Sequence, residues 1–175
     1  TYGMWSTPLV VEAGGRRQLL VALRDYFAGL DPDNGGEIWR VAGLGLQAKA
    51  SPVAGEGVAV MSGDLRGAEV AVRLDGRGEV TDTPRLWRES PPRSRVGSGV
   101  IRDGHLYGVR ANGILDCIDL ATGDVVWAER QPGAGANSSV WSSPLLVGDR
   151  LYVVNQGGDT VILKAEPKFS IVAIN

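Results

Sequence analysis

The chain has only one cysteine and one histidine among its 175 residues. A single thiol, Cys117, cannot form a disulfide within the chain. Cys117 lies in an apolar run, so we expect a buried small hydrophobic residue rather than a reactive thiol. Ser-His-Asp catalysis would have to use His105, and the sequence has no Gly-x-Ser-x-Gly nucleophile elbow. We therefore expect His105 to be a half-exposed strand residue beside the Asp103-Gly104 turn.

Long apolar runs and helical periodicity are also missing. No uninterrupted apolar stretch approaches the roughly 18 residues of a membrane span, and no basic-apolar-small leader opens the sequence. Because Thr1 begins abruptly inside a repeat unit, this absence says little about the compartment. No segment sustains apolar residues at i, i+3, i+4 and i+7 over three turns, so helices should be short or absent.

Strong positive charge is absent as well. A formal net charge of −2 and an isoelectric point near 5.4 argue against a nucleic-acid partner, which needs a strongly basic face. Arginines do gather locally, and we expect these groups to be solvated loops rather than binding patches. They are Arg16-Arg17 and the set Arg85, Arg88, Arg93 and Arg95.

The chain is rich in glycine, with 25 residues, and repeats one pattern. Segments 30–39 and 118–127 both read aliphatic-Asp-x-x-[Asn/Thr]-Gly-x-x-x-Trp. A stretched third copy runs from Leu74 to Trp87 with four extra residues between its aspartate and its tryptophan. Repetition at a period of about 20 to 50 residues indicates arrays, solenoids or propellers.

The repeat has the length of one propeller blade. The unit starts marked by Pro8, Pro52, Gly99 and Pro144 are separated by 44, 47 and 45 residues. A four-stranded propeller blade takes about 40 to 50 residues. We therefore predict an all-β fold, a β-propeller of four-stranded antiparallel blades, with about four blades at approximately 1–44, 45–90, 91–135 and 136–175.

Turn signals divide each unit into strands. In the third unit, segments 99–101, 105–109, 114–118 and 119–127 are predicted strands, and the first two connections are an Asp-Gly and an Asn-Gly turn. The Pro- and Gly-rich segments 90–94 and 131–137 fall between units, where crossings from blade to blade belong.

The recurring residues have structural explanations. Asp31 and Asp119 can each fix a turn by accepting backbone N–H bonds, and a glycine closes the turn with a positive φ. The tryptophans, which we expect to end the last strand of each unit, are large enough to dock one blade on the next. The predicted blade-docking residues are Asp31, Gly35, Trp39, Asp75, Trp87, Asp119, Gly123 and Trp127.

Two further sets of residues are candidates for binding. Trp5 and Trp141 precede the first strand of a unit in matched Trp-Ser-[Thr/Ser]-Pro segments. Packing within the fold is the simpler explanation for both, and a position at a channel mouth is the alternative. Polar residues also recur at the turns between the middle strands, and successive blades would gather these turns on one rim. They are Arg24, Asp25, Asp64, Arg110, Asn112, Asn155 and Gln156.

The Asp-x-x-[Thr/Asn]-Gly-x-x-x-Trp pattern and the Ser51-Pro52-Val53 start resemble the pyrrolo-quinoline quinone (PQQ)-like β-propeller repeat. That repeat occurs in quinoprotein dehydrogenases and in non-enzymatic relatives such as the propeller lipoprotein of the bacterial outer-membrane assembly machine. The fourth unit departs from it, because segment 164–169 replaces the turn and Val172 falls near the tryptophan slot. Family propellers have seven or eight blades, so the resemblance implies remaining blades from missing sequence or from self-association.

The resemblance implies a non-catalytic scaffold that binds a protein or a small ligand in the bacterial cell envelope, periplasmic or secreted. The alternative is a fragment of a quinoprotein alcohol or sugar dehydrogenase, which would need PQQ, Ca²⁺, a catalytic aspartate and, in many members, a vicinal cysteine pair. One cysteine and no acidic calcium loop favour the scaffold, without a cofactor. Segment 31–36 comes nearest to such a loop, and its turn role is the simpler explanation.

Overall fold

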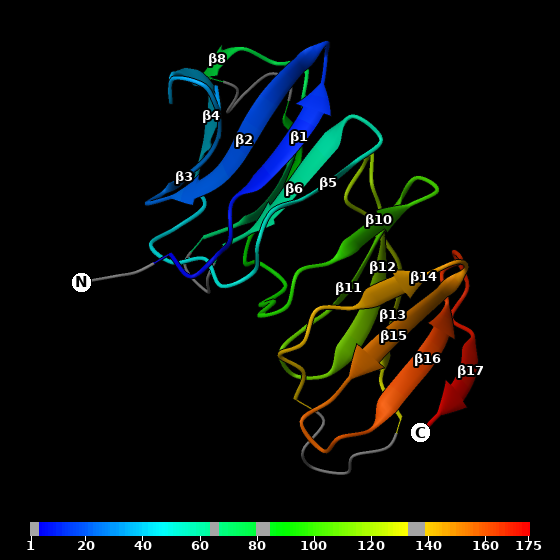
Figure 1. Ribbon diagram of the computed structural model, residues 1–175. Helices are drawn as coiled ribbons and strands as arrows, with labels where there is room; N and C mark the ends of the chain where they lie inside the picture. The colour runs from blue at the N-terminus through cyan, green and yellow to red at the C-terminus, as the bar shows by residue number, and fades with distance from the viewer. Residues whose placement is uncertain (1–3, 64–66, 80–84, 133–138) are drawn as a thin grey trace. The chain divides into compact units, whose positions relative to one another are not determined.

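The computed structural model describes residues 4–63, 67–79, 85–132 and 139–175. Those residues form seventeen strands, and the predicted all-β fold is confirmed (Figure 1). In this part of the chain, no helix is long and apolar enough to cross a membrane. The chain divides into two compact units, and each is described by itself. Unit 1 is Thr1–Ser94 with Ala121–Gly123, and unit 2 is Arg95–Leu120 with Asp124–Asn175.

Unit 1 contains two sheets. The first pairs β1 (Leu9–Ala13), β2 (Arg16–Leu23), β3 (Tyr26–Leu30) and β4 (Glu37–Ala42) in sequence order, and it gains a short parallel strand, β8 (Gly78–Glu79), beside β4. The second sheet consists of β5 (Val53–Gly55), β6 (Val58–Ser62), β7 (Glu69–Arg73) and β9 (Arg85–Glu89). The sequence did not predict β8, because two residues carry no periodicity. It arises from the stretched third copy of the repeat pattern.

Unit 2 contains two four-stranded antiparallel sheets, as predicted. The first is β10 (Val100–Arg102), β11 (His105–Val109), β12 (Ile114–Asp119) and β13 (Val125–Arg130). The second is β14 (Leu145–Val147), β15 (Arg150–Val154), β16 (Thr160–Lys164) and β17 (Ile171–Ile174). The hairpin between β10 and β11 has positive φ at both Asp103 (49°) and Gly104 (73°), the geometry that matches the twist of paired strands.

All four sheets have a register shift at the same place between their third and fourth antiparallel strands. Directly before the shift, a residue of the third strand faces the tryptophan or its replacement. The pairs are Gly29 with Trp39, Ala71 with Trp87, Cys117 with Trp127, and Ile162 with Ala173. The facing residue is small where the tryptophan is present and large where it is absent. The sizes of the two facing side chains therefore compensate for each other, which keeps the sheet closely packed at this position.

One expectation about these strands needs correction. Each tryptophan is the third residue of its strand, and the strand continues for two or three residues beyond it, so the prediction that they end the strand is wrong. In the fourth sheet the slot itself is held by Ala173, with Val172 as its neighbour. The fourth strand continues past its tryptophan because the third strand still offers backbone hydrogen-bond partners there.

The cores consist of side chains from both sheets of each unit. In unit 1, the buried cluster includes Leu20, Phe27 and Trp39 from the first sheet and Met61 and Val70 from the second. In unit 2, the cluster includes Tyr107, Leu115 and Cys117 together with Leu151 and Val161. Cys117 is fully buried, as predicted, and burial raises the pKa of its thiol to about 11.

Candidate binding rim

Trp39 connects the two sheets of unit 1. Its indole Nε1 donates a 2.7 Å hydrogen bond to Gln18 Oε1, and Gln18 Nε2 donates a 2.7 Å bond to the carbonyl of Leu74, which follows β7. The ring packs edge-on against Phe27, with centroids 5.2 Å apart. Because Trp39 is fully buried, this arrangement leaves it no exposed surface for a ligand.

Trp87 packs against Gly123, a residue that Ala121–Gly123 contributes to unit 1. A Cβ added to Gly123 would approach the indole ring to 2.7 Å, so only glycine leaves room for this contact. The guanidinium carbon of Arg93 lies 5.8 Å from the ring centroid, and Arg93 Nη2 donates a 2.8 Å bond to the Gly123 carbonyl. Trp87 is therefore held in place by a backbone turn and an arginine.

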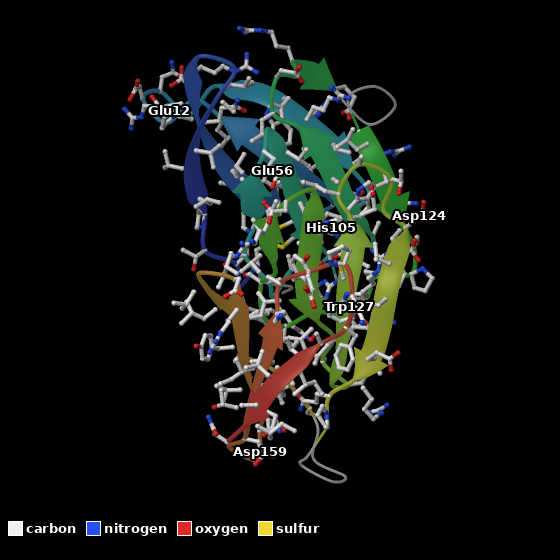
Figure 2. All side chains as sticks on the ribbon, turned by 90° about the vertical axis from the view of Figure 1, so that its right-hand side faces the viewer. Glu12, Glu56, His105, Asp124, Trp127 and Asp159 are labelled. Atoms are coloured by element: carbon white, nitrogen blue, oxygen red, sulfur yellow. The ribbon has the colours of Figure 1, made fainter. Side chains whose placement is uncertain are left out.

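Trp127 has the corresponding contacts within unit 2 (Figure 2). Its Nε1 donates a 3.2 Å bond to the Glu166 carbonyl, and its ring centroid lies 5.2 Å from that of Phe169. Glu166 and Phe169 belong to the connection between β16 and β17. Trp127 thus contacts the neighbouring sheet through the segment that replaces the usual turn.

The turn residues have their side chains committed to local structure. Asp31 Oδ1 accepts a 2.8 Å bond from the backbone N–H of Asp33, and Asp31 Oδ2 accepts a 3.0 Å bond from Asn34 Nδ2. Gly35 has a φ of 73° and Gly123 one of 81°. Asp119 closes its turn through its backbone N–H, which donates a 2.9 Å bond to the Asp124 carbonyl.

The residues present do not fit a calcium site of the quinoprotein type. The Asp31 carboxylate is occupied by its own turn, and Asp75 is an exposed residue after β7. Within the four described ranges, no three His, Cys, Asp or Glu side chains converge as metal ligands would. His105 is half-buried, and its Nδ1 lies 2.7 Å from the Asp103 carbonyl oxygen.

Two of the clustered arginines are buried, which corrects their interpretation as solvated loops. In unit 1, Arg93 Nη1 lies 2.7 Å from Glu69 Oε2. In unit 2, Arg95 Nη2 lies 2.7 Å from Asp116 Oδ1, and Arg110 Nε lies 2.9 Å from Asp116 Oδ2. Sequence reasoning missed the pairs of Arg93 and Arg95 because their carboxylates are on strands 24 and 21 residues away. Arg85 is half-buried, and Arg88 is exposed.

In unit 1, segment 43–48 links Trp5 to the turn between β2 and β3. The backbone N–H of Trp5 donates a 2.9 Å bond to the Ala48 carbonyl, and that of Asp25 donates a 2.7 Å bond to the Gly45 carbonyl. The Trp5 side chain remains 62% exposed, and Arg24 is exposed beside Asp25. The turn and the segment before β1 therefore belong to one edge of the sheet.

In unit 2, segment 139–142 carries Trp141 and joins two turns. The Val140 N–H donates to the Ala111 carbonyl (3.2 Å), and the Gln156 N–H donates to the Ser139 carbonyl (3.0 Å). Ser142 Oγ donates a 2.7 Å bond to the Val154 carbonyl. Trp141 is 64% exposed on this hydrogen-bonded segment. The segment lies at the same edge as the β11–β12 turn and the β15–β16 turn.

The polar residues predicted for the rim divide into two kinds. Asn112 and Gln156 are exposed, as is Arg24 in unit 1. Asn155 is only 5% exposed and exchanges two hydrogen bonds with Asp159, so it holds its turn together. Arg110 binds Asp116, and Asp25 Oδ1 accepts a 3.3 Å bond from the Gly45 N–H. Asp64 lies outside the described residues.

One recurring contact at these edges escaped sequence reasoning. Once in each unit, the serine before the first strand of the second sheet accepts a backbone hydrogen bond from the equivalent residue one repeat earlier. Thr7 N–H donates to Ser51 Oγ (2.8 Å), and Ser98 N–H donates to Ser143 Oγ (3.0 Å). The signal was available in the hydroxyl residue that stands one position before each unit start.

The profile of the family described as "Outer membrane protein assembly factor BamB" matches residues 24–166. The chain belongs to this PQQ-like repeat family. A comparison with curated proteins found no match. The family explains the repeated tryptophan slot and the four-stranded sheets, whereas the Ala173 slot is a departure within this chain.

Solved structures share the fold. BamB from Moraxella catarrhalis has a TM-score of 0.72 at 14% identity, over 95% of this chain and 47% of that one. A computationally designed protein, Ika8, has a TM-score of 0.70 at 10% identity, over 95% and 48%. A quinohemoprotein alcohol dehydrogenase from Pseudomonas putida HK5 has a TM-score of 0.58 at 22% identity, over 75% and 21%. The chain thus spans about half the length of the BamB structure that it matches.

Proposed function

We propose that this chain is part of a non-catalytic PQQ-like propeller of the bacterial cell envelope, periplasmic or secreted, whose rim binds a protein partner. Each unit has its own candidate edge for this rim, with Asn112, Trp141 and Gln156 in unit 2 and Trp5 and Arg24 in unit 1. The family to which the chain belongs is described as an outer-membrane protein assembly factor, and this description supports a role in binding other proteins. This description applies to the family and does not name the partner of this chain, which the experiment below is designed to identify.

The exposure of Trp141 is the observation that carries the proposal. An indole that is 64% exposed, on a segment held by three hydrogen bonds, is an aromatic anchor whose position is already ordered. Ordered aromatic side chains lose little entropy on binding and are enriched among the residues that dominate interface energies. With roughly 150–250 Å² of surface on a tryptophan and about 25 cal/mol per Å², burial of the exposed part would contribute about 2–4 kcal/mol.

The polar side chains beside Trp141 suit a protein partner. Asn112 and Gln156 are exposed and offer amide donors and acceptors on the two turns to which the Trp141 segment is hydrogen-bonded. An apolar anchor surrounded by neutral polar groups is the usual composition of a protein-protein contact. We infer no cofactor for this rim.

Photo-crosslinking tests the proposal. A photo-reactive phenylalanine analogue is placed at position 141 or, as a control, at position 168, an exposed residue of unit 2 in the connection between β16 and β17. We expect a discrete crosslinked protein from position 141 in cells of the source organism and none from position 168. The same adducts from both positions, or no adduct from position 141, would contradict the proposal.

The second candidate is a fragment of a PQQ- and calcium-dependent dehydrogenase. The structural likeness to a quinohemoprotein dehydrogenase is the observation in its favour. The single cysteine and the committed Asp31 carboxylate stand against it. Adding PQQ and Ca²⁺ and following visible absorbance and dye reduction separates the two candidates, because the scaffold predicts no change in either signal.

A further inference from the structure

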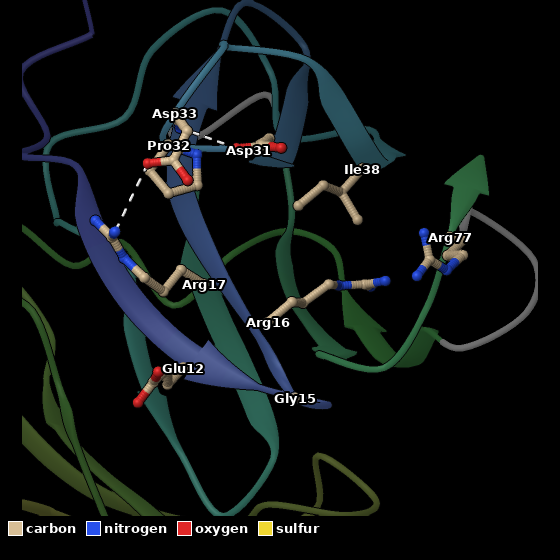
Figure 3. A pocket seen from close by; sticks show the side chains of 9 residues that line it. All are labelled: Glu12, Gly15, Arg16, Arg17, Asp31, Pro32, Asp33, Ile38 and Arg77. Atoms are coloured by element: carbon tan, nitrogen blue, oxygen red, sulfur yellow. Dashed lines mark hydrogen bonds and ion pairs between the residues drawn. The ribbon is translucent and has the colours of Figure 1, made fainter.

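A hollow of about 430 Å³ lies at the end of unit 1 where β2 begins (Figure 3). Arg16, Arg17 and Arg77 contribute to its lining, together with Asp33 and Ile38. Arg16 is the first residue of β2, whereas the rim turn with Arg24 follows the last residue of the same strand. An eight-residue strand spans about 26 Å, so this hollow is remote from the proposed rim.

Arg16 has hydrogen-bonding capacity that the protein does not use. Its Nη2 donates to the Gly76 carbonyl, whereas its Nε is buried and has no hydrogen-bond partner among the residues that the structure describes. Burial lowers the pKa of the Arg16 guanidinium, and the positive charge of Arg77 lowers it further, while Asp75 opposes both to a smaller extent. An arginine remains charged in proteins, and because the attraction of Asp75 is smaller than the repulsion of Arg77, net positive charge remains at this site.

Arg77 adds a second cation at the same place. Figure 3 shows the guanidinium groups of Arg16 and Arg77 directed toward one another, with Ile38 nearby. Arg77 is exposed, and its side chain makes no ion pair or hydrogen bond with any residue that the structure describes. Two like charges that converge at a hollow repel each other unless an anion lies between them.

The acidic residues of the lining do not neutralise this pair. Asp33 Oδ1 lies 3.6 Å from Arg17 Nη1, so Arg17 already has a counter-ion. The Asp31 carboxylate accepts two bonds within its own turn. Glu12 points away from Arg16 and Arg77 in Figure 3. The charge that remains available to a ligand is therefore that of Arg16 and Arg77.

We propose that Arg16 and Arg77 form a binding site for a small phosphate-type oxyanion. Guanidinium groups present planar pairs of donors that match the oxygens of phosphate. The unused Nε of Arg16 and the free guanidinium of Arg77 would approach such an anion from two sides. A dianion would offset both charges, whereas a single carboxylate would offset one. This site is independent of the rim and does not require the proposed function.

Titration of the native chain with inorganic phosphate at constant ionic strength tests the site, with binding followed by amide chemical shifts. We expect saturable shifts at the start of β2, and a loss of affinity of about tenfold or more in Arg77→Gln, because charge-assisted hydrogen bonds contribute about 1.5–3 kcal/mol. Arg88→Gln, which replaces an exposed arginine of β9 that does not line the hollow, is the matched control and should bind phosphate like the native chain.

Each other result would overturn the proposal. These are the absence of saturable shifts with the native chain, equal affinity in Arg77→Gln, or an equal loss in Arg88→Gln. Acetate is titrated in parallel, and acetate binding as tight as that of phosphate would overturn the assignment to a phosphate-type anion. Arg77 is exposed, so its variant should keep the native circular dichroism spectrum, and that spectrum is recorded first.

Discussion

Replacing Gly29 with alanine tests how Trp39 is held in unit 1. A Cβ at position 29 would lie 2.4 Å from Trp39 Nε1 and 2.5 Å from Trp39 Cε2. Carbon atoms in contact normally lie about 3.5–4.0 Å apart, so the ring would have to move by about 1 Å. Trp39 cannot move freely, because it is fully buried, packs on Phe27 and donates its N–H to Gln18.

The expected loss of stability follows from three effects. Overpacking a core costs about 1–3 kcal/mol. Weakening the Trp39 to Gln18 hydrogen bond costs about 1 kcal/mol. Replacing glycine by alanine within a strand favours folding by about 0.5–1 kcal/mol, because the unfolded chain loses freedom. The net destabilisation of Gly29→Ala should therefore be about 1–3 kcal/mol, so that the sign is set by the contact with Trp39.

Urea unfolding followed by circular dichroism measures this change. With a slope of about 1–3 kcal/mol per molar urea, the midpoint should fall by roughly 1 M. The control is the same substitution in a Trp39→Phe background, where the smaller ring leaves room and the cost of Gly29→Ala should shrink by at least about 1 kcal/mol. Gly29→Ala as stable as the native chain, or equally costly in both backgrounds, would refute the reasoning.

Three further predictions concern buried groups. Asp116→Ala should lower the free energy of unfolding in urea by about 3–5 kcal/mol, because it leaves Arg95 buried without its carboxylate. As a control, Asp33→Ala at the exposed Arg17 pair should lower it by less than about 1 kcal/mol. Similar losses in the two variants would contradict the reasoning. Iodoacetamide should label Cys117 far more slowly in the folded chain than in urea, and fast labelling of the folded chain would argue against a buried thiol. Since burial raises the pKa of Cys117 from 9.0 to about 11, its contribution to stability should be complete below pH 9 and decrease toward pH 11. Cys117→Ala should show a smaller decrease over that range than the native chain.

The sequence predicted the strands of unit 2 closely because the turns that separate them are specified by a few adjacent residues. The Asp103-Gly104 hairpin needs positive φ at two positions, and the turn residues meet that need without help from the rest of the fold. The tryptophan slots were also visible in the sequence, because Trp39 and Trp127 stand at the same distance from a turn aspartate and Trp87 follows its aspartate with four extra residues. The position of Trp39 inside β4, rather than at its end, was not visible, because strand ends depend on how far the neighbouring strand extends.

The candidate rim was predicted in part. Exposed Trp141 and buried Asn155 both lie in segments with turn-like composition, and sequence alone could not separate them. Their difference depends on partners, since Asn155 has Asp159 within its own turn, whereas the Trp141 segment uses its backbone to bind two other turns. The oxyanion hollow was beyond reach for the same reason, because Arg16 and Arg77 meet only after two sheets have folded together.

By itself, the sequence determined the all-β class, the four repeated sheets and the slot for a large ring in three of them, because these depend on periodicity and on turns of a few residues. Tertiary structure alone decided which charges are buried. Arg93 and Arg95 are two residues apart in a Pro- and Ser-rich segment. Each is buried because the folded chain places a carboxylate beside it, that of Glu69 for Arg93 and that of Asp116 for Arg95. The free energy of burying a charge depends on what surrounds it in space, and neighbours along the chain do not specify that environment.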